Sequence, residues 1–136
     1  IVFKSETLNP KDMKNQPTIL IVDDLKANRD TLAELLDVPD FQLVLADNGK
    51  EALRLANEAA PDLILLDVMM PGSIDGFEVC RRIKASPALK HTKVLMLTAR
   101  GQSSDKSEGR RAGADAYLTK PFSPKQLLET VNWLLP

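Results

Sequence analysis

The chain has 136 residues, a formal net charge of -1 and a pI near 5.9. Hydrophobic residues make up 43% and charged residues 27%, which is ordinary for a globular protein of one domain with a substantial core. This charge lacks the basic footprint of a domain that binds nucleic acid or an anionic membrane, and no apolar stretch approaches the ~20 residues of a membrane span.

Short apolar runs alternate along the chain with amphipathic stretches of helical length. The runs predict strands at residues 18–22, 41–45, 63–66, 94–97 and 116–118. The stretches predict helices at residues 26–36, 50–60, 77–85, 101–113 and 124–135. The last helix has the clearest start, with Ser123 as N-cap, Pro124 in the first turn and Gln126 to complete a capping box. Repeated strand–helix units predict a three-layer α/β sandwich around a parallel sheet.

Polar groups stand at the ends of four of these strands. Asp23 and Asp24 follow the first strand, Asp67 follows the third and Thr98 the fourth, and Lys120 comes just after the fifth. The carboxyl ends of parallel strands form one edge of the sheet, where ligands bind. We therefore expect all five side chains to meet in one cleft.

Three carboxylates in one cleft repel one another and raise each other's pKa unless a cation neutralises them. Mg2+ suits such a cluster, because it prefers oxygen ligands and keeps coordination positions open for phosphate oxygens, and Mn2+ is an alternative. Lys120 adds a fixed positive charge and Thr98 a hydroxyl donor. These groups together favour phosphoryl transfer onto a carboxylate.

Five segments of the sequence resemble a known family when they are taken together and in order. They are ILIVDD (19–24), LILLDVMMPG (63–72), DGFE (75–78), VLMLTA (94–99) and AGADAYLTKPF (112–122). The chain resembles the receiver domains of two-component response regulators, similar to chemotaxis regulators, over residues 17–135. Each motif alone is a weak signal, whereas their joint occurrence is highly specific. The resemblance implies a flavodoxin-like fold with a five-stranded parallel sheet in the order 2-1-3-4-5 and five helices.

The resemblance also implies a metal site. By position in the motifs, Asp67 matches the phosphoacceptor, and Asp23 and Asp24 match the acidic pair that binds the metal together with it. The backbone carbonyl of Met69 matches the third protein ligand of that metal. No cofactor other than Mg2+ or Mn2+ is implied.

The remaining site residues are implied in the same way. Lys120 matches the amine that pairs with the phosphoryl group, Thr98 the hydroxyl that closes on it, and Tyr117 the aromatic side chain whose rotamer follows activation. The peptide bond between Lys120 and Pro121 is expected to be cis, as is usual in the family.

In function, the resemblance implies a bacterial, cytoplasmic signalling switch of a phosphorelay. Its phosphodonor would be a histidine kinase or a histidine phosphotransfer protein. Phosphorylation would change the face made by the fourth helix, the fifth strand and the fifth helix. That face would control an effector or an output domain and could also form a dimer. The domain would bind no nucleic acid or membrane directly, and it would catalyse only its own phosphorylation and dephosphorylation.

The chain departs from the family pattern at two places near the acceptor. Gly72, Ser73 and Ile74 make the loop after Pro71 one residue longer than the commonest pattern, so we expect a bulge there. Leu25 stands where a polar residue often follows the acidic pair. Neither change removes a reactive group, although both could alter partner docking.

Other interpretations remain open beside the receiver. A receiver-like interaction module that works without phosphorylation is the main alternative, although such copies usually lose an acid or the lysine. A flavin-binding protein or an aspartate phosphatase is disfavoured, because DDLKAN is acidic and Met69 replaces the acid that the phosphatase needs. Asp24 alone could be a helix cap.

The ends of the chain carry two further expectations. Residues 1–16 are polar and lie outside the strand–helix pattern, so we expect a tail or linker before a receiver domain at 17–136. We expect Trp133 to pack beneath the last helix, and the single cysteine, Cys80, to be a small core residue.

Overall fold

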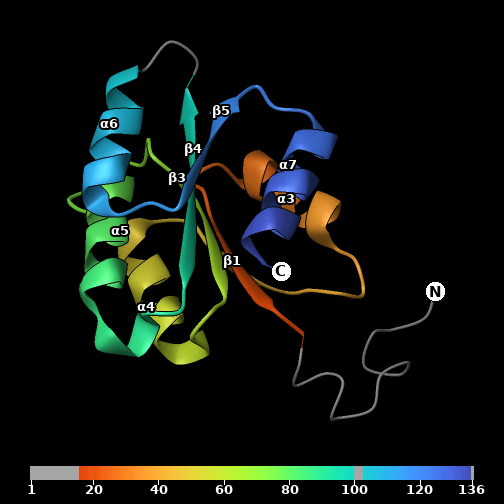
Figure 1. Cartoon of the computed structure of the whole chain (residues 1–136), viewed down its shortest axis with the longest axis horizontal. Helices are drawn as coiled ribbons and strands as arrows, with labels where there is room; N and C mark the ends of the chain where they lie inside the picture. The colour runs from red at the N-terminus through yellow and green to blue at the C-terminus, as the bar shows by residue number, and fades with distance from the viewer. Residues whose placement is uncertain (1–15, 100–102, 136) are drawn as a thin grey trace.

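The computed structural model describes residues 16–99 and 103–135 (Figure 1). Its elements, in chain order, are β1 (Thr18–Val22), α3 (Lys26–Leu36), β2 (Gln42–Ala46), α4 (Gly49–Ala59), β3 (Leu63–Asp67), α5 (Gly76–Ala85), the 3-10 turn η1 (Pro87–Leu89), β4 (Lys93–Ala99), α6 (Ser103–Ala112), β5 (Ala116–Lys120) and α7 (Pro124–Leu134). Every predicted strand and helix is present. The expected tail lies outside the described part, except for Gln16.

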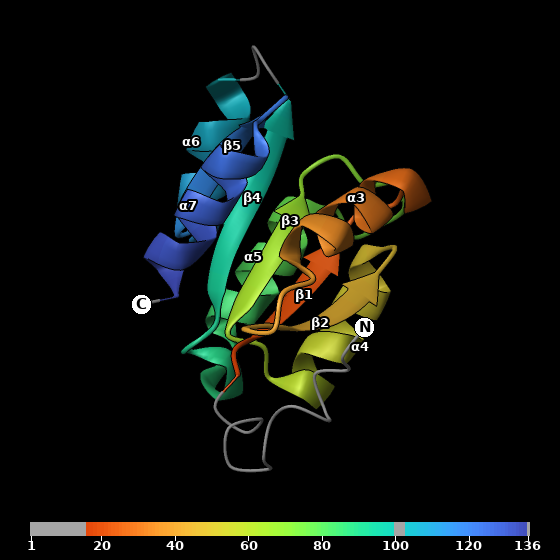
Figure 2. The same ribbon diagram turned by 90° about the vertical axis from the view of Figure 1, so that its right-hand side faces the viewer.

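The strands form one parallel sheet in the order β2-β1-β3-β4-β5. Helices α3 and α7 cover one face of this sheet, and α4, α5 and α6 cover the other (Figures 1 and 2). The predicted flavodoxin-like sandwich with order 2-1-3-4-5 is confirmed. Because all strands run the same way, their carboxyl ends lie along one edge.

Alternate residues of the central strands build two separate cores. In β1, Leu20 faces the helices α4, α5 and α6, whereas Ile19 and Ile21 face α3 and α7. All five residues of β3 are buried, as expected for a central parallel strand with helices on both faces. Each fully buried Leu or Ile contributes about 1.5–3 kcal/mol relative to an exposed one. These two cores hold the strand ends in fixed positions.

The helix starts show which polar residues act as caps. Asn48 caps α4 by accepting a hydrogen bond from the amide of Glu51. Ser123 and Gln126 form the predicted capping box of α7. The N-cap of α3 is Leu25, and no side chain caps this helix, so capping does not account for Asp24.

Outside the site, one prediction about a side chain is confirmed and one is wrong. Cys80 is fully buried, as expected. Trp133, in contrast, is 73% exposed, because Leu127, Val131 and Leu134 take the buried side of α7 and Trp133 falls on another side of the helix. None of the described helices has both the length and the apolar character needed to cross a membrane.

Candidate functional site at the carboxyl ends of the strands

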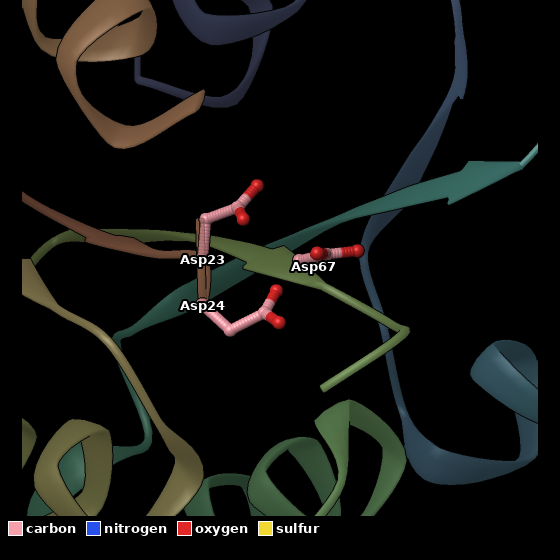
Figure 3. A group of neighbouring side chains, drawn as sticks. All are labelled: Asp23, Asp24 and Asp67. Carbon is pink, nitrogen blue, oxygen red and sulfur yellow. The ribbon is translucent and has the colours of Figure 1, made fainter. Parts of the chain in front are cut away.

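Asp23, Asp24 and Asp67 converge at the carboxyl edge of the sheet. Each offers one carboxylate oxygen to a group whose members lie within 4.8 Å of one another. Figure 3 shows the side chains of Asp23 and Asp24 leaving the end of β1 on the side of Asp67, which ends β3. The sequence predicted this meeting from the common carboxyl edge of parallel strands, and the pairing of β1 with β3 brings the acids side by side. The predicted convergence of the three acids is therefore present.

Asp23 is held by the backbone around it and is 0% exposed. Its Oδ1 accepts a hydrogen bond from the amide of Leu25 at 2.9 Å, and its carbonyl oxygen accepts one from the guanidinium of Arg29 at 2.8 Å. Its Oδ2 has no hydrogen-bond partner in the part of the chain that the structure describes. A buried carboxylate oxygen without a hydrogen bond is costly, and a bound cation would satisfy it.

Asp67 is 5% exposed, and burial raises the pKa of its carboxyl group. The ammonium of Lys120 opposes this effect and lowers the pKa, whereas the carboxylate of Asp23 raises it further. The amide of Met69 donates a hydrogen bond of 3.2 Å to Asp67 Oδ1 and also favours the charged form. Desolvation and like charge together disfavour a negative charge at this position unless a cation is added.

Lys120 supplies the positive charge of the site. Its Nζ lies 3.4 Å from Asp67 Oδ1 and 3.7 Å from Asp23 Oδ2, and its side chain is 34% exposed. It ends β5, at the far side of β4 from Asp67, and the peptide bond that follows, to Pro121, is cis as expected. The lysine therefore reaches across the cleft to the acids while part of it remains in contact with solvent.

Thr98 and Tyr117 lie on strands β4 and β5. Thr98 is 1% exposed, and its hydroxyl finds no hydrogen-bond partner among the described residues. Since a buried hydroxyl normally has a partner, Thr98 is suited to accept or donate to an incoming group. Tyr117 is half-buried and packs against the core that faces α4, α5 and α6.

Two glycines that begin helices beside the loop between β3 and α5 were not identified as site residues from the sequence. A Cβ built on Gly76 would lie 2.5 Å from the carbonyl oxygen of Asp67, so only glycine allows α5 to begin against the acceptor's own backbone. A Cβ on Gly49 would lie 2.6 Å from the carbonyl oxygen of Ile74, in the longer loop. The signal available in the sequence was a glycine at the first position of two helices.

Met69 lies in the same loop, two residues after Asp67. Met69 is 69% exposed and Leu25 is 57% exposed, so two apolar residues next to the acids in the sequence are open to solvent. Gly72, also in this loop, has a φ of 104°, a left-handed conformation that glycine adopts without strain. The role of the Met69 carbonyl as a metal ligand stays a prediction.

The donor set fits a hard divalent cation. Three carboxylates contribute oxygen atoms within reach of one ion. That ion would also bind Asp23 Oδ2, which has no hydrogen-bond partner among the described residues. Mg2+ and Mn2+ prefer oxygen ligands of this kind, whereas the described residues of the cluster offer no thiolate or imidazole for a softer metal.

The comparison with family models decides the classification. The model of the response regulator receiver domain matches residues 19–132. The chain belongs to the receiver domain family. The match includes every residue of the acidic cluster, and Thr98, Tyr117 and Lys120 as well.

Named relatives of this receiver include both longer regulators and one of similar length. The chain is 44% identical over 124 residues to the transcriptional regulatory protein ResD of Bacillus subtilis, covering 91% of the chain and 50% of ResD. It is 37% identical over 118 residues to the protein PilG of Pseudomonas aeruginosa, covering 87% of each. The chain thus spans about half the length of ResD and of the transcriptional regulators PhoB and RpaA.

Solved receiver structures have the same fold. A response regulator of Chloroflexus aurantiacus superposes with a TM-score of 0.84 at 39% identity, covering 89% of this chain and 98% of that one. The chemotaxis protein CheY4 of Vibrio cholerae gives a TM-score of 0.81 at 34% identity, with 88% and 98% covered. The receiver domain of the sensor histidine kinase PA1611 of Pseudomonas aeruginosa, at 28% identity and a TM-score of 0.79, holds a magnesium ion in its active-site cleft. The superposition covers 89% of this chain and 99% of the PA1611 receiver domain.

Membership of the family establishes the general class of function. Receiver domains are phosphoacceptor switches rather than enzymes that turn over a separate substrate, and they bind Mg2+ at an acidic pocket. In response regulators they interact with histidine kinases and with output domains.

Proposed function

We propose that this receiver accepts a phosphoryl group on Asp67 and transmits that event to the face formed by α6, β5 and α7. The observation that carries the proposal is the cluster of three carboxylates within 4.8 Å, with Lys120 Nζ only 3.4 Å from Asp67. The phosphodonor is a histidine kinase, a histidine phosphotransfer protein or, more slowly, a small acyl phosphate.

The transfer exchanges one bond at phosphorus for another. A carboxylate oxygen of Asp67 forms the new P–O bond, and the bond from phosphorus to the donor's imidazole nitrogen or acyl oxygen breaks, with the electron pair leaving on the donor. When bound, Mg2+ would neutralise the charge gathered between carboxylate and phosphoryl oxygens. Asp23, Asp24, Asp67 and the Met69 carbonyl are the proposed ligands of the metal.

The chain's own residues would orient and read the phosphoryl group. Lys120 pairs with one phosphoryl oxygen, because its ammonium already lies between Asp67 and Asp23. The Thr98 hydroxyl donates to another phosphoryl oxygen, which gives this buried group a partner that it does not find among the described residues. Movement of Thr98 then allows Tyr117 to change rotamer and alters the α6–β5–α7 face.

The proposal extends to the setting of the domain. We place the receiver at residues 17–136 after a tail or linker at 1–16, in the cytoplasm, where it controls an effector protein or an output domain. The α6–β5–α7 face is the surface for that partner or for a second receiver. The receiver domain catalyses only its own phosphorylation and dephosphorylation.

Intact mass after incubation with acetyl phosphate tests the assignment. We expect the mass of one phosphoryl group to be added in the presence of Mg2+, and no addition in Asp67→Asn or in excess chelator. Asp62→Asn is a matched control, since Asp62 precedes β3 at its other end and its carboxylate binds the amide of Thr18. Labelling that survives Asp67→Asn would overturn the assignment. An unlabelled wild-type protein that still binds its partner would favour the interaction module that works without phosphorylation.

A further inference from the structure

Helix α6 packs on the sheet without any large apolar side chain. Among its residues whose side chains are described, the buried ones are Gly109 and Ala112. All other described positions of α6 are polar, including an exposed ion pair between Glu108 and Arg81 of α5. Small residues at the contact let the helix backbone approach β4 and β5 closely, so the packing depends on what lies opposite Gly109.

Gly109 lies against Tyr117 and Met96. A Cβ built on Gly109 would be 2.9 Å from Cε1 of Tyr117 and 2.8 Å from Sδ of Met96. Both distances are shorter than non-bonded contacts of a real Cβ. Met96 and Tyr117 are themselves opposite one another in the register of β4 and β5. The Tyr117 ring therefore occupies space that exists because residue 109 has no side chain.

The same contact lies next to the proposed switch residue Thr98. Met96 and Thr98 are two residues apart in β4, so their side chains leave the same face of the sheet. Met96 is 0% exposed, and the hydroxyl of Thr98 is buried without a partner among the described residues. Met96, which lies against Gly109, is therefore the neighbour of Thr98 along this face of β4.

We propose that Gly109 is the positioning residue of the Tyr117 switch. This role of Gly109 rests on the proposed function. The absence of a side chain at Gly109 leaves the space in which the Tyr117 ring lies under α6 before phosphorylation. A methyl group at position 109 takes that space. Met96 is fully enclosed by its neighbours, whereas the half-buried Tyr117 ring lies on an edge strand and has solvent to move into. Tyr117 then leaves its position under α6 whether or not Asp67 is phosphorylated.

The substitution Gly109→Ala distinguishes this role from an ordinary effect on the helix. Alanine is a better helix former than glycine, so at an exposed site the change strengthens a helix. Ser107→Ala is the matched control, because Ser107 lies on the exposed side of α6 and also gains helix propensity, although less than glycine does. An effect seen in Gly109→Ala and absent from Ser107→Ala comes from the contact with Tyr117 and Met96.

The ring of Tyr117 provides the direct readout, since it is the only tyrosine of the chain. With its ring labelled for NMR, we expect the signals of metal-free Gly109→Ala to shift from the wild-type positions and the further change on adding Mg2+ and beryllofluoride to be lost. Ser107→Ala should keep both the wild-type positions and the change. Ring signals of Gly109→Ala at wild-type positions, with a normal change, would overturn the inference.

Thermal unfolding gives a second test that does not need the switch to operate. We expect Gly109→Ala to lower the Tm of the wild-type protein but to raise it when combined with Tyr117→Ala, because the vacated ring space accepts the methyl group and relieves Met96. If Gly109→Ala alone fails to fold, recovery of folding in the double variant would equally support the contact between residue 109 and the Tyr117 ring. Equal effects in both backgrounds would contradict the proposed contact.

The NMR experiment also distinguishes failure of the Tyr117 switch from failure of the positioning role of Gly109. If the wild-type ring signals do not respond to Mg2+ and beryllofluoride although Asp67 binds them, then Tyr117 is not a switch, and the positioning role falls with it. A wild-type response together with an unmoved ring in Gly109→Ala would overturn the positioning role alone.

Discussion

At the scale of single residues, the site combines groups that folding alone would not favour. The carboxyl of Asp67 is desolvated beside the carboxylate of Asp23, and a buried oxygen of Asp23 and the hydroxyl of Thr98 lack partners among the described residues. Each costs folding free energy of the order of 1 kcal/mol or more. Such groups are retained where a ligand completes them, which is the physical reason for assigning function to them.

Lys120→Ala and Thr98→Ala should separate phosphorylation from signalling. Since Lys120 Nζ lies 3.4 Å from the acceptor, we expect its loss to slow labelling by acetyl phosphate by roughly tenfold or more. Thr98→Ala should keep substantial labelling but lose the change in Tyr117 on activation. Intact mass and ring NMR measure the two effects. A normal Tyr117 response in Thr98→Ala would rule out its switch role.

Cys80 gives a dependence on pH that can be checked against Cys80→Ala. Burial raises the pKa of its thiol from 9.0 to about 11, so the folded state holds a proton that the unfolded state releases. This stabilisation is present below about pH 9 and is lost as the pH rises to about 11, a change of roughly 2–3 kcal/mol. We expect the wild-type advantage in free energy of unfolding over Cys80→Ala to shrink by that amount between pH 8 and 11. A constant difference would contradict it.

At the scale of secondary-structure elements, α6 differs from the other helices. Its buried side rests on Gly109 and Ala112, whereas α7 buries Leu127, Val131 and Leu134. Helices owe most of their stability in proteins to such an apolar face, and glycine inside a helix costs up to about 1 kcal/mol. A weakly held helix beside Thr98 and Tyr117 can shift between two arrangements at low cost.

We predict that hydrogen exchange is fastest in α6 among the helices of the unphosphorylated protein. Exchange there should slow on activation with Mg2+ and beryllofluoride, because the activated site orders the elements that contact it. Mass-spectrometric exchange of peptides from α6 and α7 measures the contrast. The idea fails if α6 is as protected as α7 in both states.

At the scale of the whole molecule, metal binding and folding are linked. The acidic cluster exists only when β1 and β3 are paired, so Mg2+ should bind the folded state alone. At a concentration of one hundred times Kd this adds about 2.7 kcal/mol to the free energy of unfolding. For a domain of this size that raises Tm by roughly 5–15 °C.

Calorimetry with and without Mg2+ tests this linkage. Asp24→Asn removes one carboxylate of the cluster and should greatly reduce the rise in Tm, while Asp47→Asn, outside the cluster, should leave it unchanged. An equal rise in all three proteins would show that Mg2+ acts elsewhere.

The sequence by itself determined the positions of the strands and helices and the reactive groups, and its resemblance to receiver domains supplied the strand order. Apolar runs of four or five residues identify buried parallel strands, and the motifs at their ends fall at one edge whatever the details of packing. Strand bounds were too short at β3, β4 and β5, because polar residues such as Asp67 and Lys120 continue the backbone ladder without continuing the apolar pattern. Periodicity reports burial of side chains, whereas a strand is defined by its hydrogen bonds.

Only the tertiary structure decided which small residues bring elements into contact and which way large ones face. Gly76 against the backbone of Asp67, and Gly109 against Tyr117, are close approaches between a helix and a strand, which the periodicity of a single element does not encode. Trp133 is exposed for a related reason, since Leu127, Val131 and Leu134 occupy the buried side of α7 and Trp133 falls on another side. Residue types identify the reactive groups of the chain, but the distances between elements are set by the packing of the whole chain.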